Sequence, residues 1–155
     1  MIAEELANRL REVIINGLWI ANTNYRKELS DLSFEDANTK IGSLNTIAAL
    51  TQHIHYYISG ILQVFNGGSL DIKDKYSFDF PEVTSQQSWE IIIEKLFDDT
   101  EKFALIVETI PESKLNEFFV DEKYGSYRRN IEAMIEHSYY HLGQIVLIKK
   151  LISNE

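Results

Sequence analysis

Apolar residues recur every three or four positions in four long stretches of this chain. That spacing matches the 3.6-residue period of an α-helix and gives each stretch one apolar face. It predicts helices over residues 2–29, 45–65, 84–110 and 128–152. Four amphipathic helices in a chain of 155 residues can bury their apolar faces against one another. We therefore predict an all-α fold, a four-helix bundle with long inter-helix connections, as a single domain over residues 1–155.

Local residue types suggest where these helices begin and end. Ser43 is a candidate N-cap for the second helix, and Gly67-Gly68 is a stop signal after it. Thr84 and Gln87 resemble a capping box that would open the third helix, which Pro111 would end. Each of these features places a boundary in a polar connection between two apolar stretches.

Several large or unusual residues interrupt this pattern and need an interpretation. Gly17 lies inside the first predicted helix, where we expect close packing rather than a break. Trp19 and Trp89 are expected in the core because large aromatic side chains usually bury their area there. Residues 76–80 and 118–120 are short and rich in aromatic side chains. We interpret both as extended loops that tuck aromatics against the bundle.

Composition excludes several classes of function. The formal net charge of −9 argues against a nucleic-acid binder, which usually carries a basic patch. The chain has no cysteine, so disulfides, thiolate zinc sites and cysteine nucleophiles are excluded. No apolar run approaches the roughly 20 residues of a membrane span. The first ten residues, MIAEELANRL, do not resemble a signal peptide, and we expect a cytoplasmic protein that does not bind a membrane.

All four histidines fall in two short segments. His53 and His55 lie in LTQHIHYY, and His137 and His141 lie in HSYYHLGQI. The four-residue spacing of the second pair places two imidazoles on one helical face, within reach of one metal ion. A third imidazole from another helix would complete a three-histidine site with open positions for water or substrate. The alternative is that these histidines are ordinary helix-surface residues.

The helical period does not decide whether His53 or His55 of the second helix would be the third ligand. At about 100° per residue, His53 and His55 lie on opposite edges of its apolar face, so at most one should join the site. His53 is offset in the same rotational sense as His137 and His141 on the fourth helix, which mildly favours it.

A histidine in the middle of the second helix, followed by His-x-x-x-His-x-Gly-Gln on the fourth, resembles the DinB-like superfamily. The resemblance rests on TIAALTQHI at 46–54 and IEHSYYHLGQI at 135–145, and on the number and order of helices. That family consists of four-helix-bundle proteins, many of them described as metal-dependent enzymes. It is unrelated to the DNA polymerase of similar name.

The resemblance implies a ligand set. His53, His137 and His141 would bind one divalent metal ion, with zinc or nickel expected. Gly143 and Gln144 match the family's pattern after the last ligand, whereas His55 has no counterpart in it.

Residues around this site are harder to assign from the sequence. Tyr57 and Gln144 are candidates for lining a pocket beside the ligands. A ligating imidazole usually donates its other N–H to a carboxylate or carbonyl. Besides Gln144, the polar residues Glu136, Asn22 and Asn24 are candidates for that role. No residue can be named as a catalytic acid or base.

Two hypotheses of function follow. In the first, the protein is a metal-dependent enzyme that acts on a small-molecule substrate. The resemblance suggests a thiol S-transferase using a low-molecular-weight thiol, or a hydrolase. In the second, it is a non-catalytic dimeric binding or structural bundle whose metal site is vestigial or regulatory. Tyr56, Tyr139 and Phe118 would suit the face of a homodimer.

Other catalytic arrangements fit poorly. The chain has no Gly-rich phosphate loop after a strand, no G-x-S-x-G and no H-E-x-x-H sequence. Carboxylate-bridged di-metal bundles use Glu-x-x-His motifs. Met134 and Ser138 stand three residues before His137 and His141, so this class is not expected.

Overall fold

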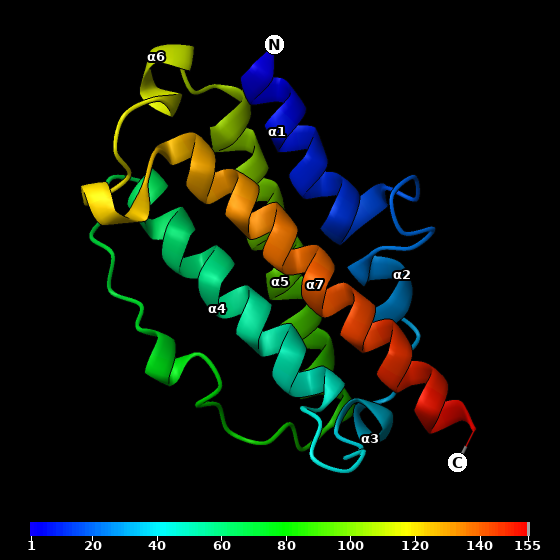
Figure 1. Ribbon diagram of the computed structural model, residues 1–155. Helices are drawn as coiled ribbons and strands as arrows, with labels where there is room; N and C mark the ends of the chain where they lie inside the picture. Colours follow the sequence, from blue (N-terminus) through cyan, green and yellow to red (C-terminus); the bar gives the residue numbers. More distant parts are fainter. Residues whose placement is uncertain (155) are drawn as a thin grey trace.

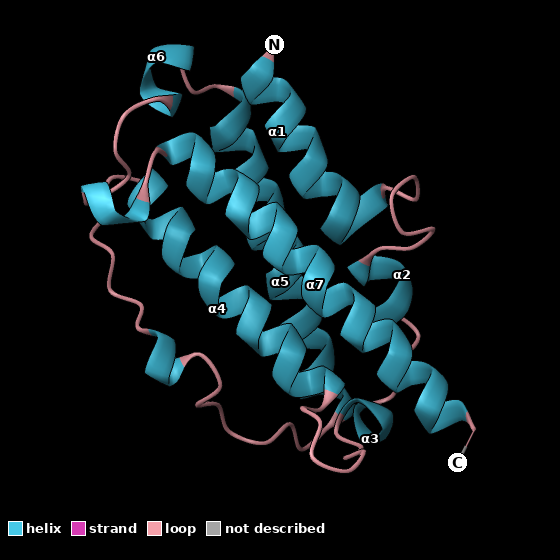
Figure 2. Ribbon diagram, viewed as in Figure 1, coloured by secondary structure: helices cyan, strands magenta, loops and turns pink. Residues whose placement is uncertain are grey.

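A computed structural model describes residues 1–154 of the chain and shows an all-α protein (Figure 2). Within these residues no strand forms, and one isolated β-bridge joins Phe118 and Ser126. The helices are α1 (Ile2–Arg11), α2 (Tyr25–Leu29), α3 (Phe34–Ala37), α4 (Ile47–Phe65), α5 (Gln86–Glu108), α6 (Glu112–Leu115) and α7 (Tyr127–Ser153). A π-helical turn, η1 (Glu12–Asn16), follows α1, and two 3₁₀ turns are η2 (Asp74–Tyr76) and η3 (Glu122–Tyr124).

The long helices lie side by side as a helical bundle (Figure 1). Helices α1 and α4 both pack against α5, and α4 also packs against α7. Figure 1 shows that α4 and α7 run in opposite directions, so the start of α4 lies beside the end of α7. None of the described helices combines the length and apolar character that a membrane crossing requires.

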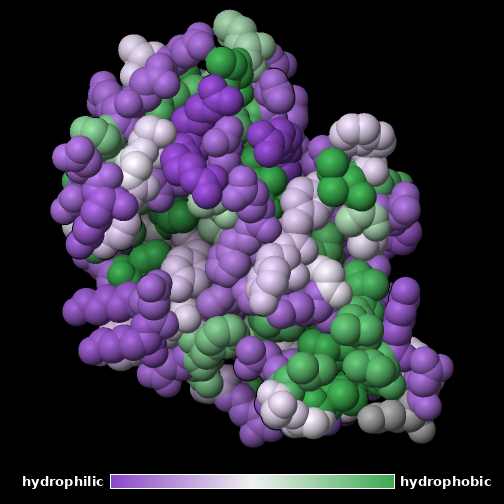
Figure 3. Space-filling view, viewed as in Figure 1, coloured by the Kyte–Doolittle hydropathy of each residue, from purple (hydrophilic) through white to green (hydrophobic). Residues whose placement is uncertain are grey.

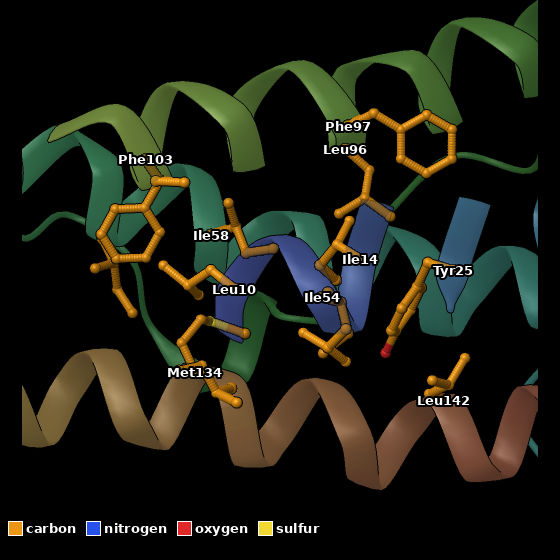
Figure 4. Close-up of a cluster of buried hydrophobic side chains, with 14 of the residues drawn as sticks. Leu10, Ile14, Tyr25, Ile54, Ile58, Leu96, Phe97, Phe103, Met134 and Leu142 are labelled. Carbon is orange, nitrogen blue, oxygen red and sulfur yellow. The ribbon is translucent and has the colours of Figure 1, made fainter. Parts of the chain in front are cut away.

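The core lies where the apolar faces of these helices meet, as the amphipathic pattern predicts. Figure 4 shows side chains from α1, η1, α4, α5 and α7 converging on one apolar cluster. Its fully or almost fully buried members include Leu10, Ile14, Ile54, Ile58, Leu96, Phe103, Met134 and Leu142. The hydroxyl of Tyr25 is also buried there and donates a hydrogen bond of 2.7 Å to the carbonyl of Ser138 on α7.

Hydroxyl side chains cap the long helices, but not always the ones predicted. The Oγ1 of Thr46 accepts from the amide of Ala49 and starts α4, so the prediction of Ser43 as its cap was wrong. The Oγ of Ser85, rather than Thr84, starts α5. In both cases a suitable hydroxyl lies nearer the first helical turn, where its oxygen reaches the free amides.

The first predicted helix is broken, contrary to our expectation. After η1 the chain turns to an extended conformation at Gly17, with ψ of 153°. A Cβ on Gly17 would lie 2.0 Å from the Cγ of Glu12, so the close approach we expected is present, but it occurs at a helix end. Asn24 fixes the following loop because its side chain donates to the Gly17 carbonyl and caps α2.

This loop also corrects the prediction for Trp19. Trp19 is 86% exposed, with Leu18 and Ile20 beside it also exposed. The apolar stripe runs through residues 18–21 in the sequence, but the loop carries them away from the core. Trp89, in contrast, is fully buried as predicted, and its indole N–H donates to the carbonyl of Leu32.

The two aromatic connections each place one aromatic ring against the bundle, but to different depths. Phe119 is buried at the end of the bundle, whereas its neighbour Phe118 is exposed. In the other connection, Ser77 is buried and Phe78 packs on α4 although nearly half of it remains exposed. Both segments place an aromatic ring against the helices, as predicted, but residues 76–78 form turns rather than the extended loop that we expected.

Candidate metal centre

Three histidines from two helices, α4 and α7, converge. His53 comes from α4, and His137 and His141 come from successive turns of α7. One ring nitrogen from each lies within 4.8 Å of the others. The Nε2 atom of His137 is 3.3 Å from that of His53 and 2.9 Å from that of His141. His53 and His141 are buried, and His137 is half-buried.

The two distances from the Nε2 of His137 fit one metal ion. With metal–nitrogen bonds of about 2.0–2.1 Å, two nitrogens on the same ion lie roughly 2.9–3.4 Å apart, depending on the coordination angle. At these distances the facing nitrogens can share a proton as a hydrogen bond, or, when all three are unprotonated, bind one cation between them. The three histidines therefore form a group that could hold a metal ion.

Hydrogen bonds on the far side of two rings orient their nitrogens. The Nδ1 of His53 lies 3.0 Å from the carbonyl oxygen of Ser77. Because a carbonyl only accepts, this Nδ1 carries the proton and leaves the lone pair on Nε2. The Nδ1 of His141 likewise donates to the Oε1 of Gln144, at 2.7 Å. Such partners are the usual outer contacts of metal-ligating histidines.

The charge state of the rings also suits metal binding. Burial lowers the pKa of His53 and of His141. Burial, together with the neighbouring His141 and His53, lowers the pKa of His137 to about 4. All three imidazoles are therefore neutral near pH 7, which is the form that binds metal ions.

Residues 77–78, which the sequence did not assign to the site, contact the His53 ring. The ring of Phe78 stacks on His53 with centroids 4.0 Å apart. Tyr57 places its ring edge-on against His53 and His137, at 5.1 and 5.3 Å, and its hydroxyl donates to Asp74 at 2.7 Å. Only the aromatic character of residues 76–80 hinted at Phe78, because periodicity says nothing about where a loop packs.

The open choice between His53 and His55 is resolved by geometry. His55 points to α5, where its Nε2 lies 2.7 Å from the Oδ2 of Asp99. It does not approach the other three histidines. The rotational offset that mildly favoured His53 is thus confirmed.

Of the polar residues considered as outer partners, Gln144 alone contacts a ligand ring. Glu136 points outward and pairs with Arg129 at 3.2 Å. Asn22 is exposed in the loop before α2 with φ of 57°, and Asn24 caps that helix. The sequence did not distinguish these roles, and the structure shows that Gln144, one turn after His141 on α7, is the partner.

Cavities lie on either side of the three histidines. One of about 320 Å³ lies between the loop before α4 and the C-terminal part of α7, with Gln144 on its wall. Another of about 430 Å³ lies beside Tyr57 and the segment that contains Asp74. The site is therefore flanked by space in which a small molecule could bind.

Comparison with known proteins adds no assignment. No family model matches the sequence, and neither a curated protein nor a solved structure is significantly similar to it. The fold and the site define the protein as a helical bundle with a three-histidine group that could hold a metal ion.

Proposed function

We propose that this protein is a DinB-like four-helix-bundle metalloenzyme in which His53, His137 and His141 bind one divalent ion, zinc or nickel. The observation that carries the proposal is the convergence of three Nε2 atoms from α4 and α7. The outward Nδ1 contacts of His53 and His141 support it, because they fix the tautomer that a ligand needs.

The donor set indicates the kind of chemistry. Three neutral imidazoles leave a divalent ion its full charge and at least one open position, so the ion acidifies a bound water or thiol and polarises a carbonyl. Zinc and nickel both favour imidazole nitrogen. These properties suit a transferase or a hydrolase of a small molecule, including a transferase that uses a low-molecular-weight thiol.

The chain supplies a matched control for the test. His55 is the one histidine outside the group, and it lies on the same helix as His53. Protein purified without a histidine tag should contain about one zinc or nickel ion per chain by elemental analysis. His55→Ala should keep the metal, whereas His141→Ala should lose it, because two imidazoles bind these ions much more weakly than three.

Turnover should follow the metal in the same variants, measured with panels of thiol-conjugation and hydrolysis substrates. Turnover by a metal-free His141→Ala protein would refute the metalloenzyme proposal. Loss of metal from His55→Ala but not from His141→Ala would refute the ligand assignment.

A second candidate is a dimeric binding module whose metal site is regulatory. The observation that favours it is the exposure of Leu18, Trp19 and Ile20, three consecutive large apolar side chains on a hydrogen-bonded loop. Contiguous exposed apolar groups often mark interaction sites. Sedimentation should then show a dimer that Trp19→Ser weakens, while metal-loaded protein remains inactive in both substrate panels.

A further inference from the structure

The smaller cavity beside the metal centre has mostly apolar walls. Leu44 precedes α4, Leu50 lies on its first turns, and Leu147 and Ile148 lie on the C-terminal half of α7. Leu44 and Leu147 are 43% and 56% exposed although they are large apolar residues. Figure 3 shows hydrophobic side chains gathered over this end of α7. No charged side chain is among the residues that line the cavity.

This cavity lies next to the three histidines along α4 and α7. Leu50 lies three residues before His53 on α4, and Gln144 lies three residues after His141 on α7. Because the two helices run in opposite directions (Figure 1), both steps lead the same way along the bundle. The cavity is therefore about one helical turn, roughly 5 Å, from the ligand residues. Gln144 links the two places because it lines the cavity and holds His141.

The larger cavity on the other side has a different character. Its wall combines the apolar side chains of Ile61, Leu70, Ile72 and Phe119 with the charged or polar groups of Lys73, Asp74 and Asn130. Tyr57 stands between it and the histidines, with its ring edge-on against His53 and His137. An apolar group placed there would desolvate charged side chains without pairing them, which is unfavourable.

We propose that the cavity formed by Leu44, Leu50, Leu147 and Ile148 binds the apolar tail of a small molecule whose polar end is coordinated at the three-histidine centre. This inference rests on the proposed metal site and adds the class of substrate to it. The substrate has a metal-binding head and a short hydrocarbon tail. A volume of about 320 Å³ lies at the small end of ligand sites, so the tail is short.

A series of straight-chain alkyl hydroxamates, from acetohydroxamate to octanohydroxamate, tests the proposal on the zinc-loaded full chain. The hydroxamate head binds zinc whatever the tail, and calorimetry gives each dissociation constant. Once the chain is long enough to enter the cavity, each further methylene should tighten binding about threefold to fourfold. The gain should stop when the cavity is full.

Three variants locate the tail. Leu147→Lys places a charge on the wall of the cavity and should abolish the gain with chain length while acetohydroxamate binds as before. Leu151→Lys, on the next turn of α7 outside the cavity, is the matched control and should keep the gain. Leu70→Lys alters the larger cavity and should also keep it. Circular dichroism and metal content verify that each variant is folded and loaded.

The possible failures point to different causes. If acetohydroxamate binds but longer chains bind no better, the tail site is refuted and the metal site stands. If the gain is lost in Leu70→Lys and kept in Leu147→Lys, the tail binds in the other cavity and the proposal is wrong. If zinc-loaded protein binds no hydroxamate at all, the proposal that the zinc ion has an open position is refuted. The tail site, which rests on that position, is then refuted as well.

Discussion

Replacing Gln144 with Met should weaken metal binding without removing a ligand. The Oε1 of Gln144 accepts a 2.7 Å hydrogen bond from the Nδ1 of His141. Methionine has a similar length but no comparable acceptor, so the Nδ1–H would lose its partner within a largely buried site. The ring would then be less firmly oriented and less basic at Nε2, the atom that faces the other histidines.

The magnitude follows from the behaviour of such outer contacts. Their loss typically lowers metal affinity by 10- to 100-fold, or about 1.4–2.8 kcal/mol. We expect Gln144→Met to fall in this range. Gln144→Glu should retain most or all of the affinity, since a carboxylate accepts the same hydrogen bond and raises the basicity of the ring further.

Competition against a chromogenic chelator at pH 7 measures the affinity of each variant for zinc and nickel. Gln87→Met is the matched control, because Gln87 is an exposed residue on α5, away from the histidines. Equal affinities for wild-type protein and Gln144→Met would show that the Gln144 contact does not position His141. A fall in Gln87→Met as large as in Gln144→Met would point to a general effect of the substitution.

Three further predictions concern pH, the His53 ring and the core. The pKa of His137 is lowered from 6.5 to about 4, so as pH falls the unfolded chain binds a proton at this residue before the folded chain does. The free energy of unfolding of metal-free protein should therefore fall as pH drops from about 6.5 to about 4. Urea titrations across this range should show a fall that is smaller in His137→Gln. Phe78→Leu removes the ring that stacks on His53 and should lower zinc affinity about threefold to tenfold in the chelator assay; unchanged affinity would contradict the positioning role. Tyr25→Phe removes the buried hydrogen bond to Ser138 and should cost about 1 kcal/mol in urea denaturation, with zinc affinity unchanged.

The sequence predicted those parts of the structure that repeat with the helical period. The apolar faces of α4, α5 and α7 and the burial of Trp89 follow from it, because burying one face of each helix is the main source of stability. The pairing of His137 with His141 was predictable for the same reason, since a four-residue spacing fixes two side chains on one face of a helix.

The features that were missed depend on local hydrogen bonds or on loop packing. The end of η1 at Gly17 depends on contacts such as the hydrogen bond from the side chain of Asn24, which lies 7 residues further along the chain. The periodic pattern continues through this break, so it gave no sign that the general tendency of large aromatic side chains to be buried would fail at Trp19. Phe78 reaches His53 only because residues 74–78 fold back on α4, where the Tyr57 hydroxyl binds Asp74.

The donor set also bears on the charge of the ligand that the centre should accept. Three neutral imidazoles would leave a bound divalent ion uncompensated, and Asp74, whose charge acts on His53, accepts a hydrogen bond from Tyr57. The protein as a whole carries a net charge of −9, which disfavours the approach of anions at low ionic strength. A molecule that is neutral in solution and loses a proton at the ion avoids this repulsion and still gains the local attraction. Thiols and hydroxamic acids behave in this way, whereas a permanently charged phosphate or carboxylate approaches against the net negative charge of the protein.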